Sequence, residues 1–483
     1  MYAFLITLRH RFKSAAATCI DVCVLGLILY GAIGLVKVAP WPEGYSGIDP
    51  VVVAVLFGAF VWAFLVRFRL YSRFAFLRPK RRIDAADVTH AAEANAASCP
   101  NYADADRLTE CGSGLAEISA DALLERDKIE LDLPEISDSY EGRCVFVSGA
   151  GGSIGSELAR QVVAAGARKV VLYDHSEYAL YTIERALRPI AEVHGVRLIP
   201  VLASVTDEIR AHAVLREQEV DIVLHAAAYK HVPMIEDNEI AGARNNVIGT
   251  QTMAVAARAA GVRRFMLVST DKAVRPTNIM GATKRLAELV VQDMQTRSES
   301  TVFSMVRFGN VLGSSGSVIP LFREQIRTGG PITLTHADVT RYFMTIPEAA
   351  RLVLLAGSYA EGGEVFVLDM GDPIRILDLA RRMVSLSGLR LRDEDHPEGD
   401  IEVRFTGLRP GEKLFEELLI DARTLPTPHP KIMRAEEIKL SELEMARLLR
   451  DLTTAIDQND KAAVRQIVQA SVDGYHIQEK IAT

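Results

Sequence analysis

The chain has 483 residues, enough for two or three domains, and its hydrophobic content of 49% supports at least one large core. Its charge is unevenly divided: residues 1–82 carry eleven Lys and Arg against three Asp and Glu, and the remainder carries 44 against 59. An acidic body argues against a nucleic-acid partner, whereas a basic N-terminal part beside apolar runs indicates a membrane.

Two apolar runs are candidate membrane spans. Residues 15–36 contain one charge, Asp21, and residues 51–66 contain none. Such lengths approach the ~20 residues that cross a bilayer, and basic residues flank the outer end of each run. We therefore expect a two-span membrane anchor over residues 1–82 with both ends in the cytoplasm. A cleaved signal peptide followed by a buried helix, or a hairpin lying in the interface, are the alternatives.

The rest of the chain divides by composition. Residues 83–117 are rich in alanine and acidic residues, which predicts a flexible linker. From residue 142, short apolar runs alternate with amphipathic helical stretches such as 154–165 and 240–260, which is typical of a doubly wound parallel sheet. The expected strands are 143–148, 169–174, 197–203, 222–226, 264–270 and 304–309.

This alternation places an α/β dinucleotide-binding (Rossmann) domain at 118–313. Residues 314–430 mix loops with short helices and predict a smaller C-terminal substrate-binding lobe. Helical patterns near 440–452 and 460–472 predict C-terminal helices within 431–483. The five cysteines show no metal-binding spacing, so we expect no metal site.

A glycine-rich segment, 149–155 (GAGGSIG), joins the first expected strand to a helix. Glycines allow a tight turn and a close approach to a pyrophosphate, which rests on the helix N-terminus. Asp174 follows Gly155 by nineteen residues and ends the next strand, where an acid binds a ribose 2′-hydroxyl. The segment therefore predicts NAD rather than NADP, although a structural turn is the alternative. The expected cofactor contacts in this segment are Gly149, Gly152, Ser153, Ile154 and Gly155.

Later strand ends contribute further candidates. Ser204 and Val205 would contact adenine, or they form an ordinary turn and helix cap. Ala226 and Ala227 are small enough for a cofactor to approach closely. Beyond them, Tyr229, Lys230 and His231 either point toward a ligand or line a loop.

The segment 269–284 (STDKAVRPTNIMGATK) carries the most chemistry. Thr270, Asp271 and Lys272 place a hydroxyl, an acid and an amine in a row after an apolar strand. Met280 and Lys284 follow with a spacing of four residues. None of the thirteen tyrosines in the chain has a lysine four residues later.

These segments, together with 306–315 (VRFGNVLGSS), 340–344 (TRYFM) and 407–413 (GLRPGEK), resemble the nucleotide-sugar 4,6-dehydratases of bacterial polysaccharide biosynthesis. That family belongs to the extended short-chain dehydrogenase/reductase superfamily, and the resemblance covers roughly 118–435. It is strongest to the membrane-bound branch acting on UDP-N-acetylglucosamine, which also has Met where related enzymes have the tyrosine of Tyr-x-x-x-Lys. Members of that branch usually have four spans and a further domain, whereas we expect two spans and a short linker.

The resemblance implies a cofactor, a substrate and a location. We expect tightly bound NAD, a UDP-sugar substrate whose C5 configuration is retained, a homo-oligomer, and a place at the bacterial cytoplasmic membrane with the catalytic body in the cytoplasm. Asp271 would protonate the departing C6 hydroxyl, Lys272 would take the C5 proton and Thr270 would hold the C4 oxygen. Lys284 would bind the nicotinamide ribose.

Two points about this chemistry stay open. Lys272 must be neutral to act as a base, so we expect burial near the nicotinamide and Lys284 to lower its pKa. With Met280 in place of a phenol, a water ordered by Thr270 or Asp271 is our candidate for receiving the C4 hydroxyl proton.

The resemblance also implies substrate contacts. Asn310, Arg341, Arg409 and Glu412 match positions that hold the diphosphate, ribose and uracil; a surface salt-bridge network is the alternative. A UDP-sugar 4-epimerase and a non-catalytic NAD-binding membrane protein are the rival functions. The adjacent Asp271 and Lys272 count against both.

Overall fold

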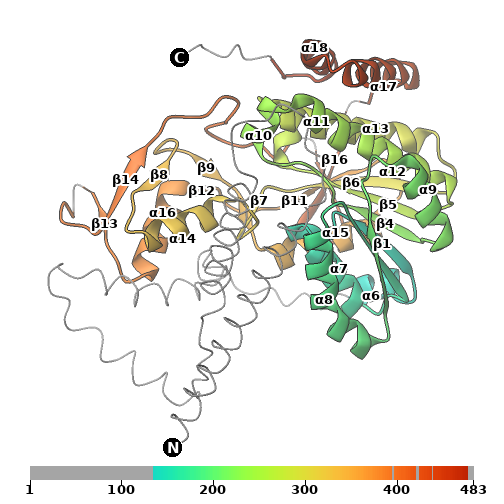
Figure 1. The fold of residues 1–483 in the computed structure, drawn as a ribbon, viewed down its shortest axis with the longest axis horizontal. Helices are drawn as coiled ribbons and strands as arrows, with labels where there is room; N and C mark the ends of the chain where they lie inside the picture. The colour runs from blue at the N-terminus through green and yellow to red at the C-terminus, as the bar shows by residue number, and fades with distance from the viewer. Residues whose placement is uncertain (1–133, 394–395, 420–423, 438, 477–483) are drawn as a thin grey trace, which may run out of the picture. The chain divides into compact units, whose positions relative to one another are not determined.

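The structure is a computed structural model that describes residues 134–393, 396–419, 424–437 and 439–476 (Figure 1). The predicted anchor over 1–82 and linker over 83–117 lie outside these residues. Among the residues described, no helix combines the length and apolarity that a membrane span requires. The fold below belongs to one compact unit within 103–483.

A nine-stranded sheet forms the centre of this unit (Figure 1). The seven strands from β11 to β3 run parallel, whereas β16 pairs antiparallel with both β11 and β15. The predicted doubly wound parallel sheet is therefore confirmed. In sheet order the strands are β15 (Thr424–Pro426), β16 (Ile432–Ala435), β11 (Val365–Leu368), β6 (Val302–Arg307), β5 (Arg264–Val268), β4 (Ile222–His225), β1 (Cys144–Ser148), β2 (Lys169–Asp174) and β3 (Arg197–Leu202).

Helices cover both faces of the sheet, so the central strands are largely apolar on both faces. Along β1, Val145 and Val147 pack into one core cluster while Cys144 and Phe146 pack into the other. The helices of the first cluster are α6 (Pro134–Tyr140), α7 (Ser153–Ala164), α8 (Glu177–His194) and α15 (Ile346–Tyr359). Those of the second are α9 (Glu208–Glu217), α12 (Gly249–Ala259), α13 (Ile279–Thr296), α17 (Glu442–Asp457) and α18 (Lys461–Ser471).

The expected helix at 240–260 is instead three segments. These are α11 (Glu239–Ala243), a π-helical segment η2 (Arg244–Ile248) and α12. In η2 the Asn246 side chain accepts from Tyr229 N at 2.8 Å and donates to Tyr229 O at 3.1 Å. The π-helical turn therefore connects this helix to the loop after β4. Such π-bulges are often found at functional sites.

The smaller lobe has its own apolar core. It contains α14 (Val318–Arg327), α16 (Ile376–Leu386) and a parallel sheet of β8 (Ile332–Leu334), β14 (Ile401–Phe405) and β13 (Leu391–Arg392). Two short strand pairs connect it to the main body: β7 (Asn310–Val311) with β10 (Phe343–Met344), and β9 (Thr340–Arg341) with β12 (Ile374–Arg375).

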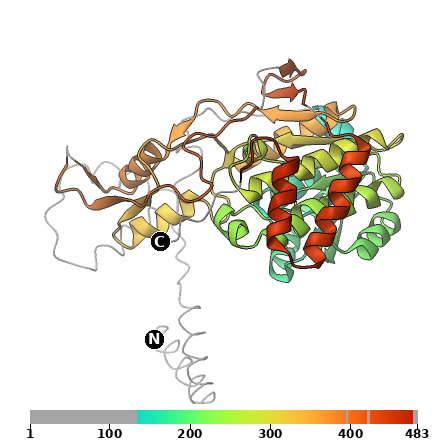
Figure 2. The ribbon, with the colours of Figure 1, turned by 90° about the horizontal axis from the view of Figure 1, so that it is seen from above.

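The division between lobe and sheet differs from the predicted boundary after residue 313. The segments α15, β11 and β15 fall within the predicted lobe at 314–430, yet they return to the main body. The buried side chains of α15 and β11 belong to one of its core clusters, and β15 pairs with β16 at the edge of the sheet. Local alternation weakens after residue 313, so this return was not visible in the sequence. The expected C-terminal helices are α17 and α18, which lie as an adjacent pair (Figure 2).

Candidate active site

The glycine-rich turn between β1 and α7 is shaped by close backbone approach. Gly149 has φ +64°, and a Cβ there would lie 2.8 Å from the Ala227 backbone. A Cβ on Gly155 would lie 2.1 Å from the Gly149 carbonyl oxygen. Only glycine fits either position, and the turn therefore packs directly on the loop after β4.

A pocket of about 240 Å³ opens beside this turn. Asp174 lies in it with 7% of its surface exposed; its carboxylate accepts from Gly151 N and from Ser176 N, each at 2.9 Å. Six other predicted contacts line the pocket: Gly149, Gly152, Ser204, Val205, Ala226 and Ala227. Tyr229 also lines the pocket, as does Asn245 of η2, which sequence reasoning missed.

Ser153, Ile154 and Gly155 lie in the first turn of α7 rather than in the pocket lining. Ser153 Oγ accepts from Ser315 N at 3.2 Å, so the loop at 314–317 rests on this helix end. His231 lies against the same loop, since a Cβ on Gly316 would be 2.4 Å from its ring. His231 and Lys230 are both exposed.

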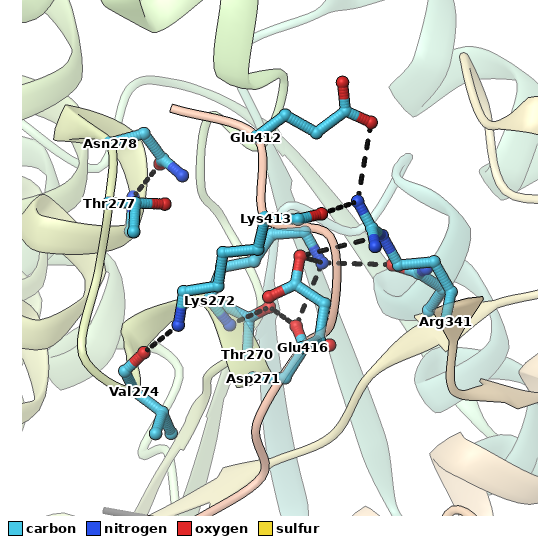
Figure 3. A network of polar contacts seen from close by, with 12 residues as sticks. Thr270, Asp271, Lys272, Val274, Thr277, Asn278, Arg341, Glu412, Lys413 and Glu416 are labelled. Atoms are coloured by element: carbon cyan, nitrogen blue, oxygen red, sulfur yellow. Dashed lines mark hydrogen bonds and ion pairs between the residues drawn. The ribbon is translucent and has the colours of Figure 1, made fainter. Parts of the chain in front are cut away.

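Thr270, Asp271 and Lys272 form one hydrogen-bonded cluster after β5, where η3 (Asp271–Ala273) begins (Figure 3). Thr270 Oγ1 donates to Asp271 Oδ1 at 2.8 Å. Lys272 Nζ donates to Asp271 Oδ1 at 3.0 Å and to Asn310 Oδ1 at 3.1 Å. The structure thus brings Asn310, which the sequence proposed as a substrate contact, together with the three proposed catalytic residues.

Residues 409–417, which we term the strap, cross this cluster (Figure 3). The Gly411 carbonyl accepts from Thr277 Oγ1 at 2.8 Å and from Asn278 Nδ2 at 3.0 Å, and Lys413 Nζ donates to Val274 O at 3.0 Å. The strap brings Glu416 to 3.7 Å from Lys272 Nζ. Sequence reasoning missed Glu416, which stands beyond the recognised segment 407–413 and carries no local signal.

Arg341 is buried and holds the strap. It donates to the carbonyls of Thr340 and Lys413 at 2.7 and 2.9 Å, and it pairs with Glu412 at 3.4 Å and Glu416 at 3.7 Å. For Arg341 and Glu412, the structure thus shows the salt-bridge network that the sequence left as an alternative to substrate contact.

Arg409 differs from Arg341. Its side chain is exposed and makes no hydrogen bond or ion pair within the described residues, while its backbone N–H donates to Glu412 Oε2 at 3.2 Å. Its guanidinium is therefore available to an anionic ligand.

The expectation of a lowered pKa for Lys272 is wrong for this structure. Burial lowers the pKa of Lys272, but the carboxylates of Asp271 and Glu416 raise it by more, so the pKa stands above its ordinary value. The sequence reading counted the neighbouring positive charges and could not see Glu416. Lys230 shows the opposite shift: partial burial and then the charge of Lys272 lower its pKa.

Lys284 and Met280 both lie in the buried part of α13. Burial lowers the pKa of Lys284 to about 8, against the opposing effect of Glu288. Its Nζ donates to Val268 O at 2.8 Å. Met280 is 1% exposed and packs in the core cluster beneath the sheet. The methionine thus continues the apolar core at the position where a tyrosine would carry a hydroxyl.

This sequence matches the family of polysaccharide biosynthesis proteins over residues 145–437. The chain belongs to this family. It is 47% identical over 343 residues to the capsular polysaccharide biosynthesis protein CapD of Staphylococcus aureus (70% of this chain, 56% of the relative). It is 37% identical over 202 residues to a UDP-glucose 4-epimerase of Rickettsia canadensis (41% and 56%). The chain therefore spans little more than half the length of these relatives.

Among solved structures, Pen from Bacillus thuringiensis is similar, with a TM-score of 0.55 and 30% identity. The match covers 64% of this chain and 98% of Pen. Together with the family match, this similarity supports the α/β fold described above.

Proposed function

We propose that this protein is a membrane-anchored, NAD-dependent 4,6-dehydratase of UDP-N-acetylglucosamine that yields the UDP-4-keto-6-deoxy sugar with C5 configuration retained. The observation that carries the proposal is the hydrogen-bonded cluster of Thr270, Asp271 and Lys272. Because β1, β4 and β5 are parallel neighbours, this cluster and the glycine-rich turn lie at the same sheet edge, where ligands of such folds bind.

The pocket residues fit NAD. Gly149 and Gly152 line the pocket beside the N-terminus of α7, where a pyrophosphate would rest. Asp174 has a carboxylate for a ribose hydroxyl and an unfavourable charge for a 2′-phosphate. When bound, NAD would accept and return a hydride, so the reaction has no net redox change.

The protein's own residues would handle the protons. Removal of hydride from C4 makes the C5 proton acidic, and Lys272 would take that proton while Asp271 gives one to the departing C6 hydroxyl. Before elimination the pair must hold a single proton on Asp271. The raised pKa of Lys272 favours the opposite arrangement. The proton would therefore pass from Nζ to Oδ1 across their 3.0 Å contact.

Thr270 and Lys284 would act beside this pair. The Thr270 hydroxyl would turn its single proton from Asp271 to the C4 oxygen once C4 is a ketone, and a water ordered by either residue would receive the C4 hydroxyl proton. Lys284 would bind the nicotinamide ribose. Arg409, whose guanidinium is exposed and unpaired within the described residues, is the candidate for the substrate diphosphate.

A product assay in deuterated water tests the proposal. The full chain is incubated with NAD and UDP-N-acetylglucosamine, and we expect a product lighter by one water, with a 4-keto group and deuterium at C5. Lys272→Ala should abolish C5 deuterium uptake while NAD binding persists. An isomer of unchanged mass would show an epimerase instead, and no conversion together with NAD binding would favour a non-catalytic protein.

A further inference from the structure

Glu416 is a buried carboxylate without hydrogen bonds that would explain its burial. Its side chain is 5% exposed, and Oε2 has no hydrogen-bond partner within the described residues. Oε1 lies 3.7 Å from Lys272 Nζ and 3.7 Å from Arg341 Nε. Both distances fit ion pairs and are too long for good hydrogen bonds, so charge alone holds this carboxylate.

The other glutamates of the strap are bonded as structural residues usually are. Glu412 accepts from Thr335 Oγ1 at 3.1 Å and from Arg409 N at 3.2 Å. Glu417 is 44% exposed and accepts from Arg275 Nη1 at 3.0 Å. Burying a carboxylate without hydrogen bonds is unfavourable, so the need to fasten a loop does not by itself explain Glu416.

Lys272 is where the charge of Glu416 acts. Its own turn supplies Asp271, β7 supplies the neutral Asn310 and the strap supplies Glu416. The positive groups near it are Arg341, which also pairs with Glu412, and Lys230 after β4. Two carboxylates therefore face one ammonium group from two separate elements of the fold (Figure 3).

We propose that Glu416 is a positioning residue of the active site: the strap inserts its carboxylate as a second counter-ion that holds the charged Lys272 side chain against Asp271. This proposal rests on the proposed function, in which Lys272 is the base. In this proposal the strap takes part in the proton chemistry. Glu416 must be in place before the protonated side chain of Lys272 is held beside Asp271.

The raised pKa of Lys272 agrees with this geometry, since Glu416 contributes to it after Asp271. Removing an opposite charge at this distance lowers the pKa of a lysine. At a fixed, mildly alkaline pH the neutral fraction of Lys272 should then rise about tenfold or more.

Chemical labelling measures this fraction without any need for activity. The full chain is treated briefly with acetic anhydride, and the acetylation rate of Lys272 is read by mass spectrometry against the same peptide labelled in denatured protein. Glu416→Gln and Glu416→Met remove the charge at similar volume. Glu416→Asp keeps it, and Glu417→Gln removes the neighbouring exposed charge as a matched control.

We expect acetylation of Lys272 to accelerate about tenfold or more in the two neutral variants and to stay near the wild-type rate in Glu416→Asp and Glu417→Gln. An unchanged rate in folded neutral variants overturns the proposal, as does equal acceleration in Glu416→Asp. Failure of both neutral variants to fold also overturns it, in favour of a purely structural role.

The pH profile of dehydration supplies the second measurement. Because a base works only when neutral, the rising limb should move to lower pH in Glu416→Gln and stay in place in Glu417→Gln. A wild-type protein that dehydrates nothing would end the proposed function, whereas the labelling result would still decide the role of Glu416.

Discussion

Met280 and Lys284 lie one helical turn apart in α13, but of the two side chains only that of the lysine makes a hydrogen bond within the described residues. The methionine is packed in the core, and the lysine ammonium reaches the Val268 carbonyl with a pKa of about 8. The side chains of Thr270, Asp271 and Lys272 form a connected chain of hydrogen bonds, and we propose that they handle the protons in this site. A single missing phenol leaves that chain intact.

His225 is expected to make the free energy of unfolding depend on pH. It is fully buried between Ser148 Oγ at 2.7 Å and Thr250 Oγ1 at 3.1 Å, and burial followed by the charge of Lys284 lowers its pKa to about 3. Between that value and about 6.5 the unfolded state binds a proton that the folded state does not. Stability should therefore be lost as the pH falls through this window, by on the order of 4 kcal/mol in total.

Urea unfolding from pH 7 downward checks this prediction. His225→Gln, which keeps a side-chain donor and acceptor, should flatten the pH dependence of the unfolding free energy. His194→Gln, at the exposed end of α8, should leave it as in the wild type. Equal slopes for all three proteins would contradict the assignment.

At the scale of elements, a buried ion network fastens α13 to β6 and to the segment after β16. Arg307 is fully buried and pairs with Glu437 and, at 2.5 Å, with Glu288. Arg285 pairs with the same two glutamates at 2.7 and 3.0 Å. Glu288 also accepts from Ser269 Oγ at 2.6 Å, directly before the catalytic cluster. The network therefore helps to position the end of β5, which Thr270, Asp271 and Lys272 follow.

Glu288→Gln tests the network. It leaves the two buried arginines undercompensated, and breaking a buried pair in this way costs about 3–5 kcal/mol of unfolding free energy. Glu324→Gln is the control, because its pair with Arg327 is exposed and such pairs contribute little to stability. Denaturant unfolding compares the two variants, and a loss below about 1 kcal/mol for Glu288→Gln would refute the prediction.

The C-terminal helices act at the same scale. α17 and α18 pack against α11 and α13, and Arg465 of α18 pairs with Glu236 at 3.3 Å and Glu239 at 3.5 Å. As a result α13 is buried along almost its whole length. The helix that carries Lys284 is thus shielded from solvent by elements more than 150 residues later in the chain.

At the scale of the whole molecule, the charge division motivates a proposal about location. Residues 1–82 are basic and the remainder is acidic, and the apolar runs 15–36 and 51–66 lie between basic flanks. We propose that residues 1–82 anchor the enzyme in the cytoplasmic membrane, which would keep the nucleotide-sugar chemistry on the cytoplasmic side.

Membrane fractionation checks this proposal. The full chain should sediment with membranes, resist extraction by high salt and dissolve in detergent, because apolar insertion is insensitive to charge screening. A chain lacking residues 1–82 should stay in the supernatant and bind NAD. Release of the full chain by salt alone would indicate surface attachment instead.

The sequence determined those features that depend on neighbours along the chain. The spacing of apolar residues and the local composition specified six of the seven parallel strands, since each of the six is largely apolar over its own length. The glycine spacing specified the turn at 149–155. These glycines allow close contacts within the β1–α7 unit or with segments that follow it in the chain. The order of Thr270, Asp271 and Lys272 indicated the chemistry in the same way.

Only the tertiary structure decided what surrounds those residues. The strap meets the catalytic cluster across more than 130 residues, so no local pattern announced Glu416 or the structural task of Arg341. The pKa of Lys272 depends on that meeting, because electrostatic interactions follow distance in space and not separation in sequence. For the same reason the sequence proposed Lys272 as a base but misjudged the direction in which its pKa is shifted.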